Sequence, residues 1–149
     1  TINTACESGS GNQVQFAAGS YTGWDSVLDI PAANGCIITG PSNASQPFVG
    51  TAILNSDGNI PTTGTIMALT GCSGSSPGAS ATVEYLTFQK TGGIDVPASC
   101  GGFEITHNEF TGNNPAIGSS YHAAIGMEGT GSDLNAGWDI SWNNFHDNC

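Results

Sequence analysis

Short segments of alternating hydrophobic and polar residues recur along the second half of the chain. Three of them align without gaps, residues 86–89, 105–108 and 140–143, at offsets of 19 and 35 residues. The last two extend to residues 103–110 and 138–145. A period of two residues is typical of a β-strand with one buried face. The pattern therefore predicts short strands, with Phe103, Ile105, Trp138 and Ile140 facing inward.

Each longer copy is interrupted by an asparagine, Asn108 or Asn143, and an aromatic residue follows two positions later. Asparagine tolerates the left-handed backbone conformation better than most residues, so we expect a sharp bend at these positions. A strand–bend–strand unit that recurs every 20 to 35 residues, with no helical pattern in between, predicts coils of a β-solenoid. Such a coil buries its apolar face only by stacking on its neighbours.

The first half of the chain fits the same organisation less regularly. No linker divides the sequence, so we expect residues 1–149 to form one domain. The further strands that we expect lie at 12–16, 27–30, 36–41, 48–54, 65–69 and 81–88. The loops that we expect lie at 42–47, 55–64, 73–80, 111–120 and 129–137.

Residues 11–21 and 36–41 resemble the opening coils of the pectate-lyase-like superfamily of right-handed parallel β-helix proteins. The units at 105–110 and 140–145 are similar to the coil repeat of that superfamily. The resemblance implies an all-β, right-handed, single-stranded parallel β-helix, and coils of this size imply about five to six of them. It also implies an extracellular protein related to polysaccharide lyases, hydrolases and esterases, or to phage spikes, adhesins and other non-catalytic solenoids.

The charge of the chain excludes some functions. One basic residue, Lys90, stands against twelve acidic residues, there is no arginine, and the formal net charge is -11. Nucleic-acid sites need clustered Lys and Arg, so DNA and RNA are excluded as partners. No apolar run is long enough to cross a bilayer, so we expect no membrane insertion. Only 9% of the residues are charged and 22 are glycine, which favours short strands and turns over long helices.

The five cysteines, at positions 6, 36, 72, 100 and 149, form no C-x-x-C pair. Disulfides in an oxidising compartment are therefore expected, in the mature form of a secreted protein. In a parallel β-helix, cysteines one coil apart lie close enough to bridge. The resemblance therefore implies Cys6–Cys36 and Cys72–Cys100, with Cys36–Cys72 as the alternative. Cys149 remains as a free thiol or a link to another chain.

Two acidic residues share a position in the aligned repeats. Glu104 and Asp139 fall in one outward column, about 5 Å apart if their strands are neighbours. Such a pair is able to serve as the acid and nucleophile of a retaining glycosidase or to bind Ca²⁺ together with Glu109, Glu128 or Asp147. The alternative is that both carboxylates are simply hydrated. Ca²⁺ is the only cofactor that the sequence suggests.

The three histidines, His107, His122 and His146, show no spacing typical of a metal site. We expect packed or surface histidines rather than ligands. His146 and Asp147 are adjacent and could form an acid–base pair, but neighbouring residues of a strand point to opposite faces.

Several aromatic residues are candidates for stacking on sugar rings. Trp24 lies between Gly23 and Asp25 in a loop-like stretch and is the favoured exposed platform, and Tyr21 and Tyr121 are further candidates. Trp138 and Trp142 are expected in the core.

No catalytic residue is assigned. The chain lacks a G-x-S-x-G nucleophile motif. The resemblance to pectate lyases implies an arginine as the catalytic base, and the chain has no arginine. The paired aspartates of polygalacturonases are also absent. Whether the protein is an enzyme stays open. One hypothesis is a secreted carbohydrate-active or polysaccharide-binding β-helix, of which this chain would be the amino-terminal part. The others are a structural subunit that stacks with copies of itself into an extracellular filament, and a surface adhesin.

Overall fold

The computed structural model describes residues 2–7, 11–22, 28–31, 35–42, 51–55, 66–70, 81–96, 102–113, 124–127 and 138–148. Within these ranges the chain has one short helix, α1 (Ile2–Glu7), and strands of three or four residues. The strands are β1 (Gln13–Gln15), β2 (Gly19–Tyr21), β3 (Leu28–Pro31), β4 (Ile37–Thr39), β5 (Ala52–Asn55), β6 (Met67–Thr70), β7 (Thr82–Glu84), β8 (Leu86–Gln89), β9 (Ile94–Val96), β10 (Glu104–Thr106), β11 (Glu109–Thr111), β12 (Ile125–Met127), β13 (Asp139–Ser141) and β14 (Asn144–His146). The expected all-β class is confirmed for this part of the chain.

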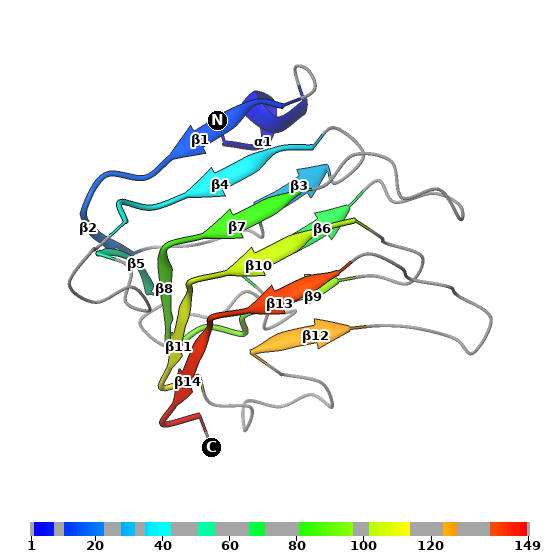
Figure 1. Cartoon of the computed structure of the whole chain (residues 1–149). Helices are drawn as coiled ribbons and strands as arrows, with labels where there is room; N and C mark the ends of the chain where they lie inside the picture. Colours follow the sequence, from blue (N-terminus) through cyan, green and yellow to red (C-terminus); the bar gives the residue numbers. More distant parts are fainter. Residues whose placement is uncertain are drawn as a thin grey trace.

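The strands form three parallel sheets (Figure 1). Their orders are β1-β4-β7-β10-β13, β14-β11-β8-β5-β2 and β12-β9-β6-β3. Each strand pairs with the strand three places away in the chain, so the chain visits all three sheets before it returns to the first. Stacked parallel sheets of this kind are compatible with a β-solenoid, in which each unit buries its apolar side chains against its neighbours.

The pairing register tests the alignment of the repeats. Ile105 of β10 pairs with Ile140 of β13, which confirms the offset of 35 residues. The offset of 19 residues was wrong, because Ile105 pairs with Val83 and not with Leu86. Leu86 begins the strand after the bend and pairs with Ala52. The four-residue match failed because apolar residues stand on both sides of the bend at Tyr85.

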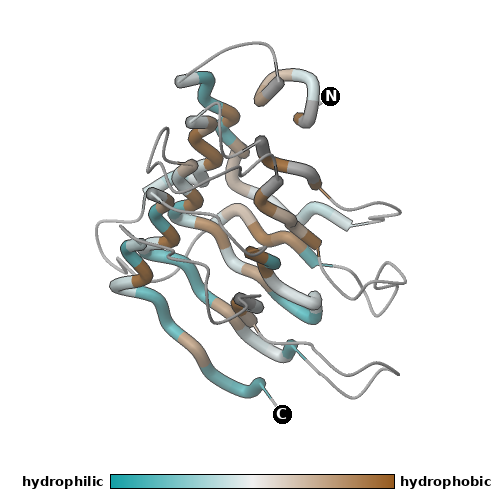
Figure 2. The backbone as a smooth tube through the Cα atoms, turned by 90° about the vertical axis from the view of Figure 1, so that its right-hand side faces the viewer, coloured by the Kyte–Doolittle hydropathy of each residue, from teal (hydrophilic) through white to brown (hydrophobic). Residues whose placement is uncertain are grey.

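The core is made of side chains that follow one another from strand to strand. Leu54, Phe88 and Phe110 are register partners in neighbouring strands, and all three are fully buried. The rings of Phe88 and Phe110 stack with their centroids 4.9 Å apart. Figure 2 shows that hydrophobic and hydrophilic positions are interspersed along the backbone. Each fully buried side chain of this size stabilises the fold by about 1.5–3 kcal/mol.

The bends between strands use a left-handed residue followed by an asparagine in two of the repeats. Tyr85, His107 and Trp142 have φ values of 56°, 57° and 57°. The expectation that Asn108 and Asn143 themselves adopt this conformation was wrong, because the residue before each asparagine does so. The asparagine side chain is then free to hydrogen-bond to the backbone of the neighbouring strand–bend–strand unit.

These asparagines continue the backbone hydrogen bonding through the bends. The Oδ1 atom of buried Asn108 accepts from the Leu86 N–H at 3.1 Å, and its Nδ2 donates to the Val83 carbonyl at 2.9 Å. Asn143 repeats the arrangement one strand further on, accepting from the Asn108 N–H at 2.9 Å. After the second bend, Asn113 accepts from Thr91 and Asn148 accepts from Asn113, at 2.8 and 3.0 Å.

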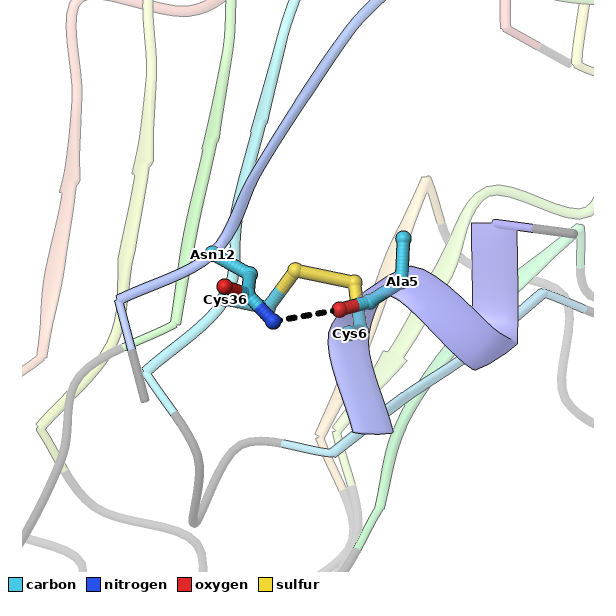
Figure 3. Close-up of a disulfide and its surroundings, with 4 residues drawn as sticks. All are labelled: Ala5, Cys6, Asn12 and Cys36. Carbon is cyan, nitrogen blue, oxygen red and sulfur yellow. Dashed lines mark hydrogen bonds between the residues drawn. A yellow bond between two sulfur atoms is a disulfide. The ribbon is translucent and has the colours of Figure 1, made fainter. Parts of the chain in front are cut away.

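The helix α1, which the sequence pattern did not predict, packs against β1 and β3 at the same end of the molecule as β1 (Figure 1). Buried Cys6 forms a disulfide with Cys36, with the Cα atoms 5.3 Å apart, which confirms this expected pair and excludes Cys36–Cys72. Beside it, the Asn12 amide donates to the Ala5 carbonyl at 2.7 Å (Figure 3).

Some strands differ from the sequence-based expectations, and one expected disulfide lies outside the described residues. The strands β9 and β12 were not predicted, and Thr111, expected in a loop, completes β11. Cys72, Cys100 and Cys149 lie outside the described residues, and so does the expected Cys72–Cys100 pair.

Candidate functional site

Three titratable side chains meet on the outer surface of β11 and β14. His146 Nε2 lies 2.8 Å from Glu109 Oε1, and His146 Nδ1 lies 2.9 Å from Asp147 Oδ2. In the parallel pair, Glu109 is the register partner of Asn144 and Thr111 that of His146. Glu109 and His146 are therefore diagonal neighbours on one face, a separation that long side chains bridge. We call Glu109, His146 and Asp147 the His146 cluster.

The backbone explains why Asp147 reaches its sequence neighbour. The strand β14 ends at His146, and Asp147 has a left-handed conformation with φ of 55°. The rule that adjacent residues point to opposite faces applies within a strand, and Asp147 lies just beyond one. The sequence-based objection to a His146–Asp147 pair was therefore wrong.

Hydroxyl groups complete the surroundings of the cluster. The Thr87 hydroxyl donates to Glu109 Oε2 at 2.9 Å, which fixes the carboxylate from the side opposite His146. The Thr111 hydroxyl lies 3.3 Å from His146 Nδ1. The Glu109 side chain is 13% exposed, that of His146 40% and that of Asp147 82%. The cluster thus has an anchored carboxylate at its base and an accessible imidazole above it.

The two carboxylates change the protonation of the imidazole. Hydrogen bonds with Glu109 first, and with Asp147 second, raise the pKa of His146 above its usual 6.5. The two carboxylates therefore favour the charged imidazolium, which donates from both ring nitrogens. Asp147 lies closer to Nδ1 than Thr111 does, so the imidazole is not set up as a base for the Thr111 hydroxyl. The cluster fits ligand binding better than nucleophilic catalysis.

The His146 cluster stands at one end of a row of polar side chains. Asn55, Gln89, Thr111 and His146 are successive register partners in β5, β8, β11 and β14. They point outward, because the residues before them, such as Leu54 and Phe88, are buried and a strand alternates. The Asn55 amide donates to Gln89 Oε1 at 3.0 Å. We call these four residues the polar column, and neighbouring members are spaced by the strand separation of about 4.8 Å.

The acidic pair expected from the repeats lies on another sheet. Glu104 and Asp139 are register partners in β10 and β13, and both are exposed. Glu109 and Asp147, expected as further Ca²⁺ ligands, belong to the His146 cluster instead. Among the described residues no group of three or more His, Cys, Asp or Glu side chains is placed to hold a metal ion. Glu128 and His122 lie outside these residues.

The structure describes only some of the aromatic residues that were considered for stacking on sugar rings. The Tyr21 ring packs against the core and edge-on to Phe16 at 4.9 Å, and its hydroxyl donates to the Ala17 carbonyl at 2.9 Å. Trp24 and Tyr121 lie outside the described residues. Trp138 is partly buried and packs against the core, with its ring tilted against that of Phe103 at a centroid distance of 5.2 Å.

Trp142 does not lie in the core. It is 64% exposed, and its ring follows those of Tyr85 and His107 in a stack with centroid distances of 5.1 and 6.2 Å. The prediction failed because the alternation of the strand stops at Trp142, which takes the left-handed position in the bend.

A longer alignment of the repeats would have revealed the His146 cluster. Residues 105–113 and 140–148 match over nine positions, and this alignment places Thr111 opposite His146 and Glu109 opposite Asn144. The sequence pattern did not predict the match beyond Phe110, because residues 111–120 were expected to form a loop.

In the part of the chain that the structure describes, no helix has the length and apolar character needed to span a membrane. Neither family models nor curated proteins nor solved structures give a match to the chain.

Proposed function

We propose that the chain is a right-handed parallel β-helix module of a secreted protein, similar to the pectate-lyase-like superfamily. The strand order supports this fold, because β1 to β12 make four rounds of the three sheets and β13 and β14 begin a fifth. Parallel strands joined by crossovers are right-handed in almost all proteins. The Cys6–Cys36 disulfide is compatible with an oxidising, extracellular location.

We further propose that this module binds a polysaccharide along the polar column. The observation that carries the proposal is the column itself, in which Asn55, Gln89, Thr111 and His146 present amide, hydroxyl and imidazole groups at regular spacing. Sugar hydroxyls both donate and accept hydrogen bonds, and amide and hydroxyl side chains do the same. The carboxylate of Glu109, fixed by Thr87, adds a charged acceptor for a sugar hydroxyl or an ammonium group.

The charge of the protein limits the class of polysaccharide. With a formal net charge of -11, the surface attracts cationic chains and repels anionic ones. We therefore expect neutral or amino-sugar polysaccharides as ligands, and polygalacturonate only where Ca²⁺ bridges the carboxylates. Binding is favoured over cleavage, because no arginine is available as a lyase base.

Affinity electrophoresis in gels that contain one polysaccharide each tests the proposal. The panel consists of xylan, a mixed-linkage glucan, chitosan, and polygalacturonate with and without Ca²⁺. We expect retardation by at least one neutral or cationic polymer. Glu109→Gln and His146→Gln should each weaken binding by about tenfold or more, since a hydrogen bond to a charged group is worth about 1.5–3 kcal/mol.

The matched control is Glu104→Gln, which removes the same charge from the exposed face of β10 in another sheet. This variant should bind like the unmodified protein. Absence of binding to every neutral and cationic polymer would contradict the proposal, and so would an equal loss in Glu104→Gln.

A further inference from the structure

The polar column belongs to strands that keep one register across their sheet. Its first three members, Asn55, Gln89 and Thr111, lie on β5, β8 and β11, and each of these strands has a hydrogen-bonded neighbour on both sides. The parallel pairing runs from Asn55 through Gln89 and Thr111 to His146 without a slip. Figure 1 shows the four strands following one another along one side of the molecule. The column is therefore a regular series of polar groups with a repeat of about 4.8 Å.

Hydrogen bonds between the side chains hold the outer face of these strands in place. The Asn55 amide donates to Gln89 Oε1 at 3.0 Å. Thr87 and Glu109, which stand two residues before Gln89 and Thr111 on the same face, are joined by the bond from the Thr87 hydroxyl at 2.9 Å. Polar groups that are already held in position do not follow a ligand. The spacing of the groups therefore decides which ligand fits them.

A repeating ligand keeps its hydrogen bonds along such a column only if its own repeat matches that of the strands. Hydrogen bonds are confined to donor–acceptor distances of about 2.5 to 3.2 Å. Any difference between the two repeats adds up from one strand to the next. A ligand with another repeat therefore makes good hydrogen bonds with only one or two members of the column.

Polysaccharides of β-1,4-linked pyranose residues have a matching repeat. Both linking bonds of each ring are equatorial and leave from opposite ends of the ring, so the chain is extended and advances per residue by a distance close to the strand spacing. Chains with α-1,4 or β-1,3 linkages curve, and their successive residues turn away from a row of groups. Neighbouring β-1,4-linked residues present opposite edges, and amide and hydroxyl side chains serve both edges because they donate and accept.

We propose that the polar column selects β-1,4-linked polysaccharides, which lie along the column with one sugar residue per strand. This inference rests on the proposed function and adds the linkage of the polymer and its direction on the surface. Neutral glucans and xylans and the amino-sugar polymer chitosan share the β-1,4 linkage. Their charge also suits a protein with a formal net charge of -11.

Isothermal titration calorimetry with tetrasaccharides of different linkage tests the selection. Cellotetraose, maltotetraose and laminaritetraose are all glucose tetramers, with β-1,4, α-1,4 and β-1,3 linkages, and the β-1,4-linked tetramers of xylose and glucosamine complete the set. The best β-1,4-linked tetramer should bind at least about tenfold more tightly than maltotetraose and laminaritetraose, because a lost register leaves hydrogen bonds unmade. Its affinity should also exceed that of the corresponding trimer and dimer, because each added sugar reaches another strand.

Two glutamine variants locate the binding. Gln89→Ala removes an amide from the middle of the column and should lower the affinity for the best tetramer by about threefold to tenfold. Gln15→Ala is the matched control, because Gln15 is exposed on β1 in another sheet, and it should leave the affinity unchanged.

The outcomes separate this inference from the proposed function. If maltotetraose or laminaritetraose binds as tightly as the best β-1,4-linked tetramer, the selection is overturned and polysaccharide binding still stands. The same holds if polymers of the gel panel bind and no tetramer does. Absence of binding by every tetramer and every polymer overturns both.

Discussion

At the residue scale, the asparagines at the bends connect neighbouring strands through hydrogen bonds between side chain and backbone. Asn108 is fully buried, and its side chain pairs with the backbone on both sides of the preceding bend. A buried polar group without a partner is costly. Removing one of these hydrogen bonds therefore lowers the free energy of unfolding by more than the net contribution of the bond to stability. Asn108 thus fixes the position of the bend at Tyr85.

Asn108→Ala tests this role. The substitution leaves the Leu86 N–H and the Val83 carbonyl without their partner, at about 1–3 kcal/mol for each. We expect the free energy of unfolding, measured by urea titration, to fall by at least about 2 kcal/mol. Asn144→Ala, at an exposed position in β14, should change it by no more than about 0.5 kcal/mol. Similar losses in both variants would refute the role.

The His146 cluster predicts a dependence of stability on pH. Because the pKa of His146 is higher in the folded protein than its usual 6.5, the imidazolium stabilises the fold. That contribution is fully present below pH 6.5 and is lost as the pH rises through the raised pKa. The stability difference between the unmodified protein and His146→Gln should therefore be larger at pH 5.5 than at pH 9.

Urea titrations at the two pH values measure this difference, and in the Glu109→Gln background it should shrink at pH 5.5. A difference that stays constant with pH would mean that the carboxylates do not hold the imidazolium.

At this scale, the resemblance to parallel β-helix proteins implied the Cys6–Cys36 disulfide, with Cys36–Cys72 as the alternative, and the repeat alignment placed Glu104 and Asp139 in a common column. The sequence did not predict the contact between the Glu109 and His146 side chains. That contact depends on the diagonal neighbour in a parallel pair, and the register beyond Phe110 was not recognised.

At the scale of elements, the bends decide which residues face the core. A left-handed residue resets the alternation, and Trp142 is exposed for this reason although it continues the spacing of Trp138 and Ile140. The strands with clear alternation were predictable. The helix α1 and the strands β9 and β12 were not predicted, because they lie outside the aligned repeats that revealed β10 and β13.

Gly40, in the bend after β4, lies where there is no room for a side chain. A Cβ atom at this position would collide with the Tyr85 carbonyl group, which is backbone and is not free to rotate away. Gly40→Ala should lower the unfolding free energy by about 1–3 kcal/mol or more.

Gly126→Ala is the matched control, because a Cβ there meets Asp95 Oδ1 at 3.5 Å, an ordinary contact. Its stability should stay within about 0.5 kcal/mol. Thermal unfolding followed by circular dichroism compares the two variants, and equal melting temperatures would contradict this role of Gly40.

At the scale of the whole molecule, the two ends of the described structure differ. One is covered by α1 and tied by the Cys6–Cys36 bond, and at the other β13 and β14 are the outermost strands of two sheets within the described residues, with Ile140, Trp142 and Phe145 exposed. The all-β class was predictable from the period of the strands and from the composition. The difference between the ends was not, because it depends on where α1 packs.

The disulfide should stabilise the molecule mainly by restricting the unfolded chain. It joins residues 30 positions apart, for which the chain-entropy relation gives about 3.5 kcal/mol. The double variant Cys6→Ala, Cys36→Ala should lose about that amount in urea titrations. Its amide exchange should rise most in α1 and β1 and least in β10 and β11. A uniform rise along the chain would show that α1 is not held by this bond.

The central claim is that a polysaccharide lies along the polar column. Chemical-shift mapping of the labelled protein, titrated with soluble oligosaccharides of the polymers that retard it, tests this claim most directly. We predict the largest shifts at Gln89, Glu109, Thr111 and His146, with little change at Glu104 and Asp139. Shifts centred on Glu104 and Asp139, or no shifts with any neutral or cationic oligosaccharide, would contradict the claim.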